Sequence, residues 1–294
     1  MAHRAGYVAI VGRPNVGKST LLNALVGTKV AIVTPKPQTT RTRVAGVRTL
    51  PEAQIVFVDT PGIHAARSLI NRRMVDVAQQ ALADADVVLF VVDATAGITP
   101  GDREIAVSLA GGRATAIVVL SKRDRVRPPA LLPLMATLST LLPDRDIVPV
   151  SARTGEGVPE LLESVVRALP EGPVLYPDAD YTTETERFLV QELVREQLFL
   201  QTEEEIPYGT AVEVEEFSER PDGALLTIRA TVLVDRPGHK AIVIGAGGQR
   251  LREIGQRARL ELETLFAVKV FLQLFVRVEP GWARNARRLE ELGL

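Results

Sequence analysis

The sequence has no cysteine among its 294 residues. Disulfides, cysteine-ligated zinc, iron–sulfur clusters and thiol nucleophiles are therefore excluded. Its apolar runs are short, as at 87–92 and 114–120, whereas a membrane-spanning helix needs about 20 apolar residues. No apolar stretch of the kind found in signal peptides stands near residue 1. We therefore expect a protein of the cytoplasm.

The length favours two domains, since domains most often have about 100–150 residues. Strand-like runs alternate with helix-like segments from residue 7 to residue 169, which is typical of a doubly wound α/β domain with a mainly parallel sheet. A stretch rich in proline and glycine follows at 171–178. The later segments have the order α-β-β-α-α-β. We predict an α/β domain at 1–172, a linker at 173–181 and a smaller α+β domain at 182–294.

The net charge of −1 hides an asymmetry within the second domain. Residues 181–235 contain 4 Arg and 13 Asp or Glu, a net charge of −9. Residues 236–288 contain 11 Lys or Arg and 4 Glu, a net charge of +7. A basic segment is either the contact surface for a polyanion or an ordinary solvated surface, and the charge alone leaves both interpretations open.

A phosphate-binding loop is indicated by the residues G-R-P-N-V-G-K-S at 12–19, which fit the pattern G-x-x-x-x-G-K-[ST] between a strand and a helix. The N–H groups of such a loop form an anion cradle. Lys18 is placed to reach the β- and γ-phosphates, and the Ser19 hydroxyl to bind Mg²⁺. The predicted nucleotide-binding residues here are Gly12, Arg13, Pro14, Asn15, Val16, Gly17, Lys18, Ser19 and Thr20.

Later motifs favour GTP over ATP, and so over a metabolic P-loop ATPase or kinase. Asp124 is placed to accept hydrogen bonds from the guanine N1–H and 2-amino group, which adenine does not offer in that arrangement. The stem of Lys122 can lie against the base, and a backbone N–H near Ala152 can donate to guanine O6. All three follow strands, where open α/β sheets bind ligands. The predicted set is Ser121, Lys122, Asp124, Ser151, Ala152 and Arg153.

The catalytic prediction concerns the γ-phosphate and Mg²⁺. Asp59 ends an apolar strand and can hold Mg²⁺ through water, and the Gly62 N–H can meet the γ-phosphate. Thr40, in the loop expected to act as switch I, is the predicted threonine ligand of Mg²⁺, with Thr39 as the alternative. The predicted catalytic residues are Lys18, Thr40, Asp59 and Gly62. The predicted metal ligands are Ser19, Thr40 and Asp59.

These motifs resemble the G1, G3, G4 and G5 boxes of translation-factor-like GTPases, with two departures. Ser121 stands where the G4 box has asparagine, and Ile63 stands where Ras-like proteins have a water-orienting glutamine. Isoleucine cannot orient water, so we expect slow hydrolysis without a partner or a cation. Asn15 is where some GTPases of this class hold K⁺, which makes K⁺ a second candidate cofactor beside Mg²⁺.

The second domain carries G-A-G-G at 245–248 between two helix-like segments, and its order of elements resembles a type II KH domain. Glycines without a Cβ let a nucleic-acid backbone approach closely. A lone G-x-x-G is usually only a turn, and Arg257 and Arg259 on the next helix are either RNA contacts or a solvated face. The predicted RNA-binding residues are Lys240, Gly245, Ala246, Gly247, Gly248, Arg250 and Arg252.

A G domain followed by a KH domain resembles, over essentially the whole chain, the Era family of ribosome-assembly GTPases (TrmE-Era-EngA-like). The resemblance implies a GTP/GDP switch that binds single-stranded 16S rRNA near its 3′ end and assists assembly of the 30S subunit, as a monomer and without DNA. Peripheral association with the inner membrane, also suggested for the family, has no clear basic amphipathic helix to support it. The alternative function is a non-catalytic RNA-binding protein whose nucleotide is structural.

Overall fold

The structure is a computed structural model that describes residues 2–62, 69–112 and 114–294. The described residues form two compact units. The first contains most of the chain as far as Thr183. The second contains Ile32–Thr39, Leu69, Ile70 and Glu184–Leu294. Most of the loop before Thr40 therefore belongs to the second unit, which the sequence did not indicate.

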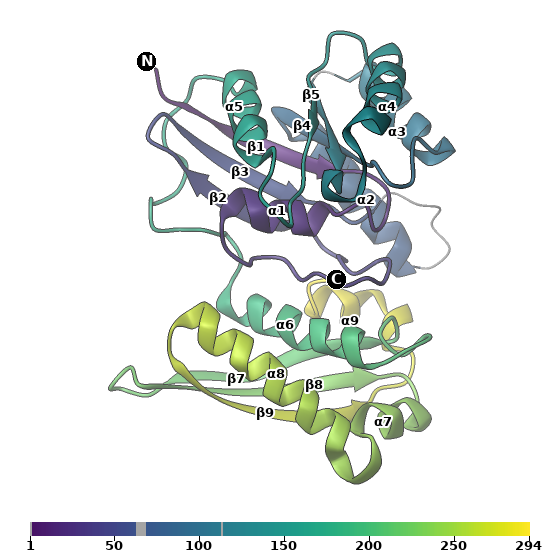
Figure 1. Ribbon diagram of the computed structural model, residues 1–294. Helices are drawn as coiled ribbons and strands as arrows, with labels where there is room; N and C mark the ends of the chain where they lie inside the picture. The colour runs from purple at the N-terminus through teal and green to yellow at the C-terminus, as the bar shows by residue number, and fades with distance from the viewer. Residues whose placement is uncertain (1, 63–68, 113) are drawn as a thin grey trace. The chain divides into compact units, whose positions relative to one another are not determined.

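The first unit is built on a six-stranded sheet with the order β2-β3-β1-β4-β5-β6. Only β2 is antiparallel to its neighbour, and the other pairs are parallel. This is the predicted doubly wound, mainly parallel sheet (Figure 1). The elements are β1 (Arg4–Val11), α1 (Lys18–Val26), β2 (Val44–Thr49), β3 (Ala53–Asp59), α2 (Leu69–Ala83), β4 (Val87–Asp93), α3 (Pro100–Ala110), β5 (Thr115–Ser121), α4 (Pro128–Leu141), β6 (Ile147–Pro149) and α5 (Val158–Ala168).

The central strands are apolar because both faces of the sheet are covered. All seven residues of β4 are buried. Apolar residues of α3 and α4 pack on one face against β1, β4 and β5, and α1 and α5 contact each other on the other face. Parallel strands covered on both faces need continuous apolar runs. The carboxyl ends of β1, β3, β4 and β5 meet at one edge of the sheet, where the predicted nucleotide-binding residues lie.

The second unit has a three-stranded sheet in the order β7-β8-β9, with β7 antiparallel and β9 parallel to β8. Apolar residues of α6, α7 and α8 pack on one face of this sheet. Trp282 and α9 cover part of the other face against Ala211 and Leu233. The elements are α6 (Glu186–Gln201), β7 (Thr210–Glu219), β8 (Leu225–Val234), α7 (Pro237–Ile244), α8 (Gln249–Phe266), β9 (Lys269–Val278) and α9 (Ala286–Glu291).

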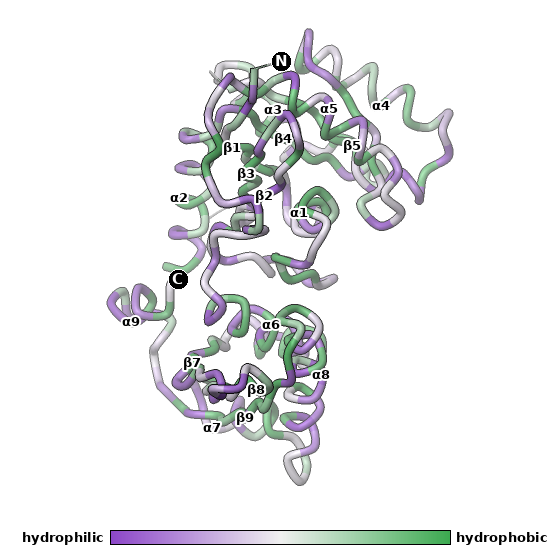
Figure 2. Tube along the Cα trace, turned by 90° about the vertical axis from the view of Figure 1, so that its left-hand side faces the viewer, coloured by the Kyte–Doolittle hydropathy of each residue, from purple (hydrophilic) through white to green (hydrophobic). Residues whose placement is uncertain are grey.

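Helix α8 is amphipathic, and its tube alternates between hydrophobic and hydrophilic positions (Figure 2). Ile254, Ala258 and Leu262 are its buried residues, at the spacing of one helix face. Its neighbouring faces carry glycine, glutamine and arginine instead. The predicted α-β-β-α-α-β order is confirmed, and the helix following Pro280 is the short α9.

Candidate nucleotide site and nucleic-acid groove

The loop from Gly12 to Gly17 joins β1 to α1 and needs its glycines. Gly12 has a φ of 153°, and a Cβ on it would lie 2.5 Å from the Val91 carbonyl oxygen. Gly17 has a φ of 101°, in the region that favours glycine. The loop leads directly into the first turn of α1, whose free N–H groups and dipole favour an anion.

Lys18 is buried inside this loop. Its Nζ donates to the carbonyl oxygens of Gly12 and Arg13, each at 3.1 Å. Burial lowers the pKa of the Lys18 ammonium to about 8, and the negative charge of Asp59 offsets this only in part. A cation held in a poorly solvated place gains strongly from an anionic partner such as phosphate.

Three oxygen-bearing side chains meet next to the loop. The Ser19 hydroxyl donates to Asp59 Oδ2 at 2.5 Å, and the Thr40 hydroxyl donates to the same oxygen at 3.2 Å. The two hydroxyl oxygens are 3.0 Å apart. Asp59 is fully buried, and its Oδ1 has no hydrogen-bond partner among the residues that the structure describes. Burial raises the pKa of the Asp59 carboxyl.

This cluster fits a magnesium ion. A buried carboxylate with an unpartnered oxygen, beside two hydroxyls, is the kind of hard oxygen donor set that Mg²⁺ prefers. Thr39, the alternative ligand, is not part of it. The Thr39 Oγ1 lies 2.7 Å from Thr34 Oγ1 and donates to the Lys36 carbonyl at 2.9 Å. The structure therefore brings Thr40, and not Thr39, to Ser19 and Asp59.

The residues predicted to bind guanine lie together at the carboxyl ends of β5 and β6. Asp124 accepts from the Ser151 hydroxyl at 2.8 Å and from two nitrogens of Arg153 at 3.1 and 2.8 Å. The hydrogen bonds from Arg153, and then that from Ser151, lower the pKa of Asp124. Its carboxylate thus stays an acceptor, as recognition of guanine requires.

Ser121 contacts the phosphate-binding loop. Its hydroxyl donates to the Val16 carbonyl at 2.6 Å, so a link between this box and the loop is present with serine in place of asparagine. Lys122 also reaches the loop, because its Nζ donates to the Asn15 carbonyl at 2.8 Å. The Asn15 side chain is exposed, and K⁺ binding there stays a prediction.

Two acidic residues that the sequence did not single out position parts of this site. Asp93, at the end of β4, pairs with Lys122 Nζ at 2.6 Å. Asp102 is buried, accepts from the Thr99 N–H at 2.9 Å and pairs with Arg13 Nε at 2.9 Å. The capping pattern from Thr99 to Asp102 was a readable signal for a helix start, but the pairing with Arg13 depends on the fold.

The γ-phosphate side is described only as far as Gly62. A Cβ at Gly62 would lie 2.8 Å from the Pro14 backbone nitrogen, so its backbone passes close to the loop. Ile63, the predicted departure from the glutamine of Ras-like proteins, lies outside the described residues.

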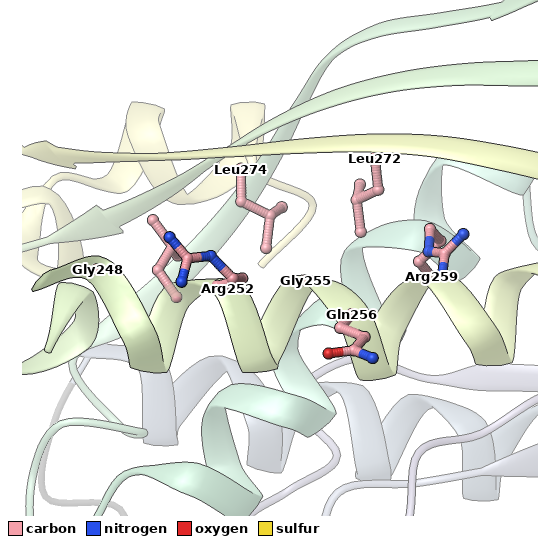
Figure 3. A pocket seen from close by; sticks show the side chains of 8 residues that line it. Gly248, Arg252, Gly255, Gln256, Arg259, Leu272 and Leu274 are labelled. Carbon is pink, nitrogen blue, oxygen red and sulfur yellow. The ribbon is translucent and has the colours of Figure 1, made fainter.

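The second site is a groove of about 480 Å³ between α8 and β9. Arg252, Gly255 and Arg259 come from α8, and Leu272 and Leu274 reach toward them from β9 (Figure 3). The complete lining is Gly248, Leu251, Arg252, Gly255, Gln256, Arg259, Leu272 and Leu274.

The G-x-x-G loop opens onto this groove at Gly248. Gly245 has a φ of 73°, and a Cβ on it would lie 2.8 Å from the Arg250 Cβ. Gly247 and Gly248 have φ values of 57° and 77° with nothing within 4 Å of an added Cβ. The loop is thus both conformationally dependent on glycine and open to an approaching backbone.

Of the residues predicted to bind RNA, Gly248 and Arg252 line the groove. The other predicted residues do not line the groove: Lys240, Gly245, Ala246, Gly247 and Arg250. The Arg250 Nη1 donates to the Ile242 carbonyl at 2.6 Å. Arg259, for which the sequence left two interpretations open, also lines the groove. The leucines of β9 were missed, because nothing in the sequence pairs them with α8.

Together these features define a class: a P-loop GTP-binding domain joined to a KH domain. Family models agree, since a "50S ribosome-binding GTPase" model matches residues 7–122 and a "KH domain" model matches residues 205–283. The chain belongs to the GTPase Era family. It is 50% identical to GTPase Era of Geobacter metallireducens over 99% of this chain and 97% of that protein, and 43% identical to that of Caldicellulosiruptor saccharolyticus over 100% and 98%.

Two solved structures resemble the whole chain. Era in complex with MgGDPNP and nucleotides 1506–1542 of 16S ribosomal RNA matches with a TM-score of 0.93 and 43% identity. A variant of Aquifex aeolicus Era bound to GDP.AlF4- matches with a TM-score of 0.94 and 43% identity. In both cases the match covers 99% of this chain and 99% of the other.

Proposed function

We propose that this protein is a GTPase switch of the cytoplasm that binds single-stranded 16S rRNA near its 3′ end and assists assembly of the 30S subunit. The observation that carries the proposal is that one chain holds both a cluster of Ser19, Thr40 and Asp59 oxygens beside a phosphate-binding loop and an open groove at its G-x-x-G loop. The matched Era structure with MgGDPNP and 16S ribosomal RNA supports both halves.

In the nucleotide site, Lys18 would neutralise the β- and γ-phosphates, and Ser19, Thr40 and Asp59 would hold Mg²⁺, Asp59 through water. The metal supplies positive charge to the phosphoryl group when it is bound. The Gly62 N–H donates to the γ-phosphate. Asp124 accepts from the guanine N1–H and 2-amino group, and the Ala152 region donates to O6. These groups catalyse by positioning and electrostatics, which is the usual requirement of phosphoryl transfer.

Hydrolysis is expected to be slow on its own, because Ile63 has no group that orients water. Asn15 is the proposed K⁺ ligand, and the ion would add positive charge beside the phosphates. Turnover measured in K⁺ and in Na⁺ at equal ionic strength tests this role. Equal rates in the two salts exclude it.

For localisation, no helix in the described part of the chain is both long and apolar enough to cross a bilayer. Peripheral association with the inner membrane remains a prediction, which vesicle co-sedimentation of the full chain would test.

The deciding experiment measures GTP turnover and RNA binding in the same full-length protein. We expect hydrolysis of GTP in preference to ATP, and binding of a labelled single-stranded RNA from the 16S rRNA 3′ end. Replacing Gly247 and Gly248 by Asp puts side chains and negative charge where a phosphate must approach, so this variant should lose RNA binding and keep GTP binding.

Arg252→Ala provides a graded comparison. It should weaken RNA binding and flatten its salt dependence, because each phosphate contact releases condensed counterions. Duplex RNA of the same sequence should compete poorly, since its base edges are paired. An absence of turnover would favour the non-catalytic alternative. Undiminished RNA affinity in the double-Asp variant would mean that the G-x-x-G loop is only a turn.

A further inference from the structure

Helix α8 has a glycine in its interior. Among the residues that the structure describes, Gly255 is the one glycine that lies within a helix and more than two positions from both of its ends. Glycine is the poorest helix former after proline, because it loses the most backbone freedom on folding. A glycine at this place therefore lowers the stability of the helix, and a packing or binding role is the usual compensation.

Packing within the protein does not require this glycine. A Cβ built on Gly255 would lie 3.5 Å from Leu274 Cδ1 and 3.9 Å from Leu274 Cγ, which are ordinary van der Waals distances. Gly245 differs from Gly255 in this respect, because a Cβ built on it would lie 2.8 Å from the Arg250 Cβ and its φ is positive. The fold accommodates alanine at 255 but not at 245.

The space above Gly255 belongs to the groove. Arg252 and Arg259 lie three residues before it and four residues after it, on the same side of α8. Leu272 and Leu274 face it from β9 (Figure 3). A methyl group at 255 would thus stand between the two arginines and touch Leu274.

The lining also indicates which part of a nucleotide fits there. A phosphate placed against Leu272 and Leu274 would exchange water for apolar side chains that cannot form hydrogen bonds, which is costly. The face of an unpaired base has no such cost. Arg252 is exposed and makes no ion pair with any described residue, so it can meet phosphates at the rim of the groove.

We infer that Gly255 determines nucleobase binding in this groove, an inference that rests on the proposed RNA-binding function. Its missing side chain leaves the space in which one unpaired base lies against Leu272 and Leu274. With glycine in place of alanine at 255, helix α8 is less stable and the groove is deeper.

The test compares Gly255→Ala with Gly238→Ala in the full-length protein. Gly238 is the second residue of α7 in the second unit, and nothing lies within 4 Å of a Cβ built on it. We expect Gly255→Ala to weaken binding of the 16S 3′-end oligonucleotide about tenfold or more, as one added carbon does in a filled pocket. Its melting temperature should stay the same or rise by a few degrees. Gly238→Ala should bind RNA like the wild type.

A set of oligonucleotides with one abasic nucleotide each sharpens the test. At one position, removal of the base should weaken wild-type binding, and Gly255→Ala should then cause little further loss. Such non-additivity is the signature of two groups that compete for one space. Equal losses for Gly255→Ala with every oligonucleotide would overturn the inference.

The other outcomes separate this inference from the proposed function. If wild-type protein does not bind the oligonucleotide, the RNA-binding function itself fails. If the double-Asp variant at Gly247 and Gly248 loses binding but Gly255→Ala keeps it, only the inference about Gly255 fails. A lower melting temperature for Gly255→Ala would show that the fold needs the glycine, and would also overturn it.

Discussion

The two candidate sites of this protein are built in opposite ways. In the nucleotide site, the charged side chains of Lys18 and Asp59 are buried, Lys18 donates to the Gly12 carbonyl, and Asp59 accepts from the Ser19 hydroxyl. At the groove and the loop that leads to it, Gly247 and Gly248 face open space and Arg252 is exposed. A site for chemistry holds its polar groups in fixed geometry, whereas a site for single-stranded nucleic acid needs an accessible surface for bases and phosphates.

This difference predicts how substitutions act. Removing one partner in the nucleotide site leaves a buried charge or hydroxyl without its hydrogen bonds, which is costly. Removing one contact in the groove exposes the remaining groups to water, which costs less. The predictions below follow that order, from the largest effect to the smallest.

The largest effect is expected for Thr40→Ala. The Thr40 hydroxyl is 3.0 Å from Ser19 Oγ and donates to Asp59. Its loss should slow GTP hydrolysis by about 10²–10³, as the loss of one transition-state contact does in other enzymes. Single-turnover hydrolysis measures it. Thr39→Ala is the control, and a slower rate for that variant than for Thr40→Ala would show that the wrong threonine was chosen.

A smaller effect is expected for Asp124→Asn. The amide presents a donor where the carboxylate accepts, so affinity for GTP should fall by about 100-fold, the size of a lost charged hydrogen bond. Affinity for xanthosine triphosphate should rise instead. Equilibrium binding of both nucleotides checks the exchange, and an unchanged preference for GTP would contradict the assignment of Asp124.

The buried Lys18 predicts a pH dependence of nucleotide binding. Its pKa is lowered to about 8, and phosphate favours the protonated form. Affinity should be constant below pH 7 and fall as pH rises past 8, by up to about tenfold per pH unit. Calorimetry in buffers of different ionisation enthalpy should detect proton uptake on binding at pH 8.5. No uptake there would mean that Lys18 keeps its proton.

The smallest effect is expected for Asp102→Asn. The Asp102 carboxylate is buried, but the Arg13 side chain that it binds is partly exposed, which weakens the ion pair. Losing the negative charge should raise the Kd for GTP about threefold to tenfold, equivalent to about 1 kcal/mol. The exposed pair between Arg287 and Glu291 offers a control, since Arg287→Ala should leave GTP binding unchanged.

Much of the nucleotide site was predictable because its signals are local. The phosphate-binding loop is eight consecutive residues, and the helix after it begins at Lys18 as the motif requires. Asp59 and Ser121 end apolar strands and Ser151 follows one, and parallel strands bring their carboxyl ends to one edge. The division into an α/β unit and an α+β unit followed from the order of the strand and helix patterns.

Charge was the least reliable guide from the sequence. The +7 segment suggested a basic face, but Arg277 and Arg288 pair with Glu213 at 2.7 and 2.8 Å, and Arg288 also pairs with Glu279. Part of the net charge of the basic segment is therefore neutralised by Glu213, which belongs to the acidic segment. The arginines that line the groove are Arg252 and Arg259.

The sequence by itself determined the fold class, the phosphate-binding loop, the place of Asp124 after an apolar strand and the G-x-x-G loop, because consecutive residues carry those features. Only the tertiary structure brought Thr40, and not Thr39, to Ser19 and Asp59, joined Arg13 to Asp102 across 89 positions, and set Gly255 opposite Leu274. The physical reason is that dihedral preferences and apolar periodicity act over a few residues, whereas hydrogen bonds and packing between distant segments exist only once the sheets and helices have assembled.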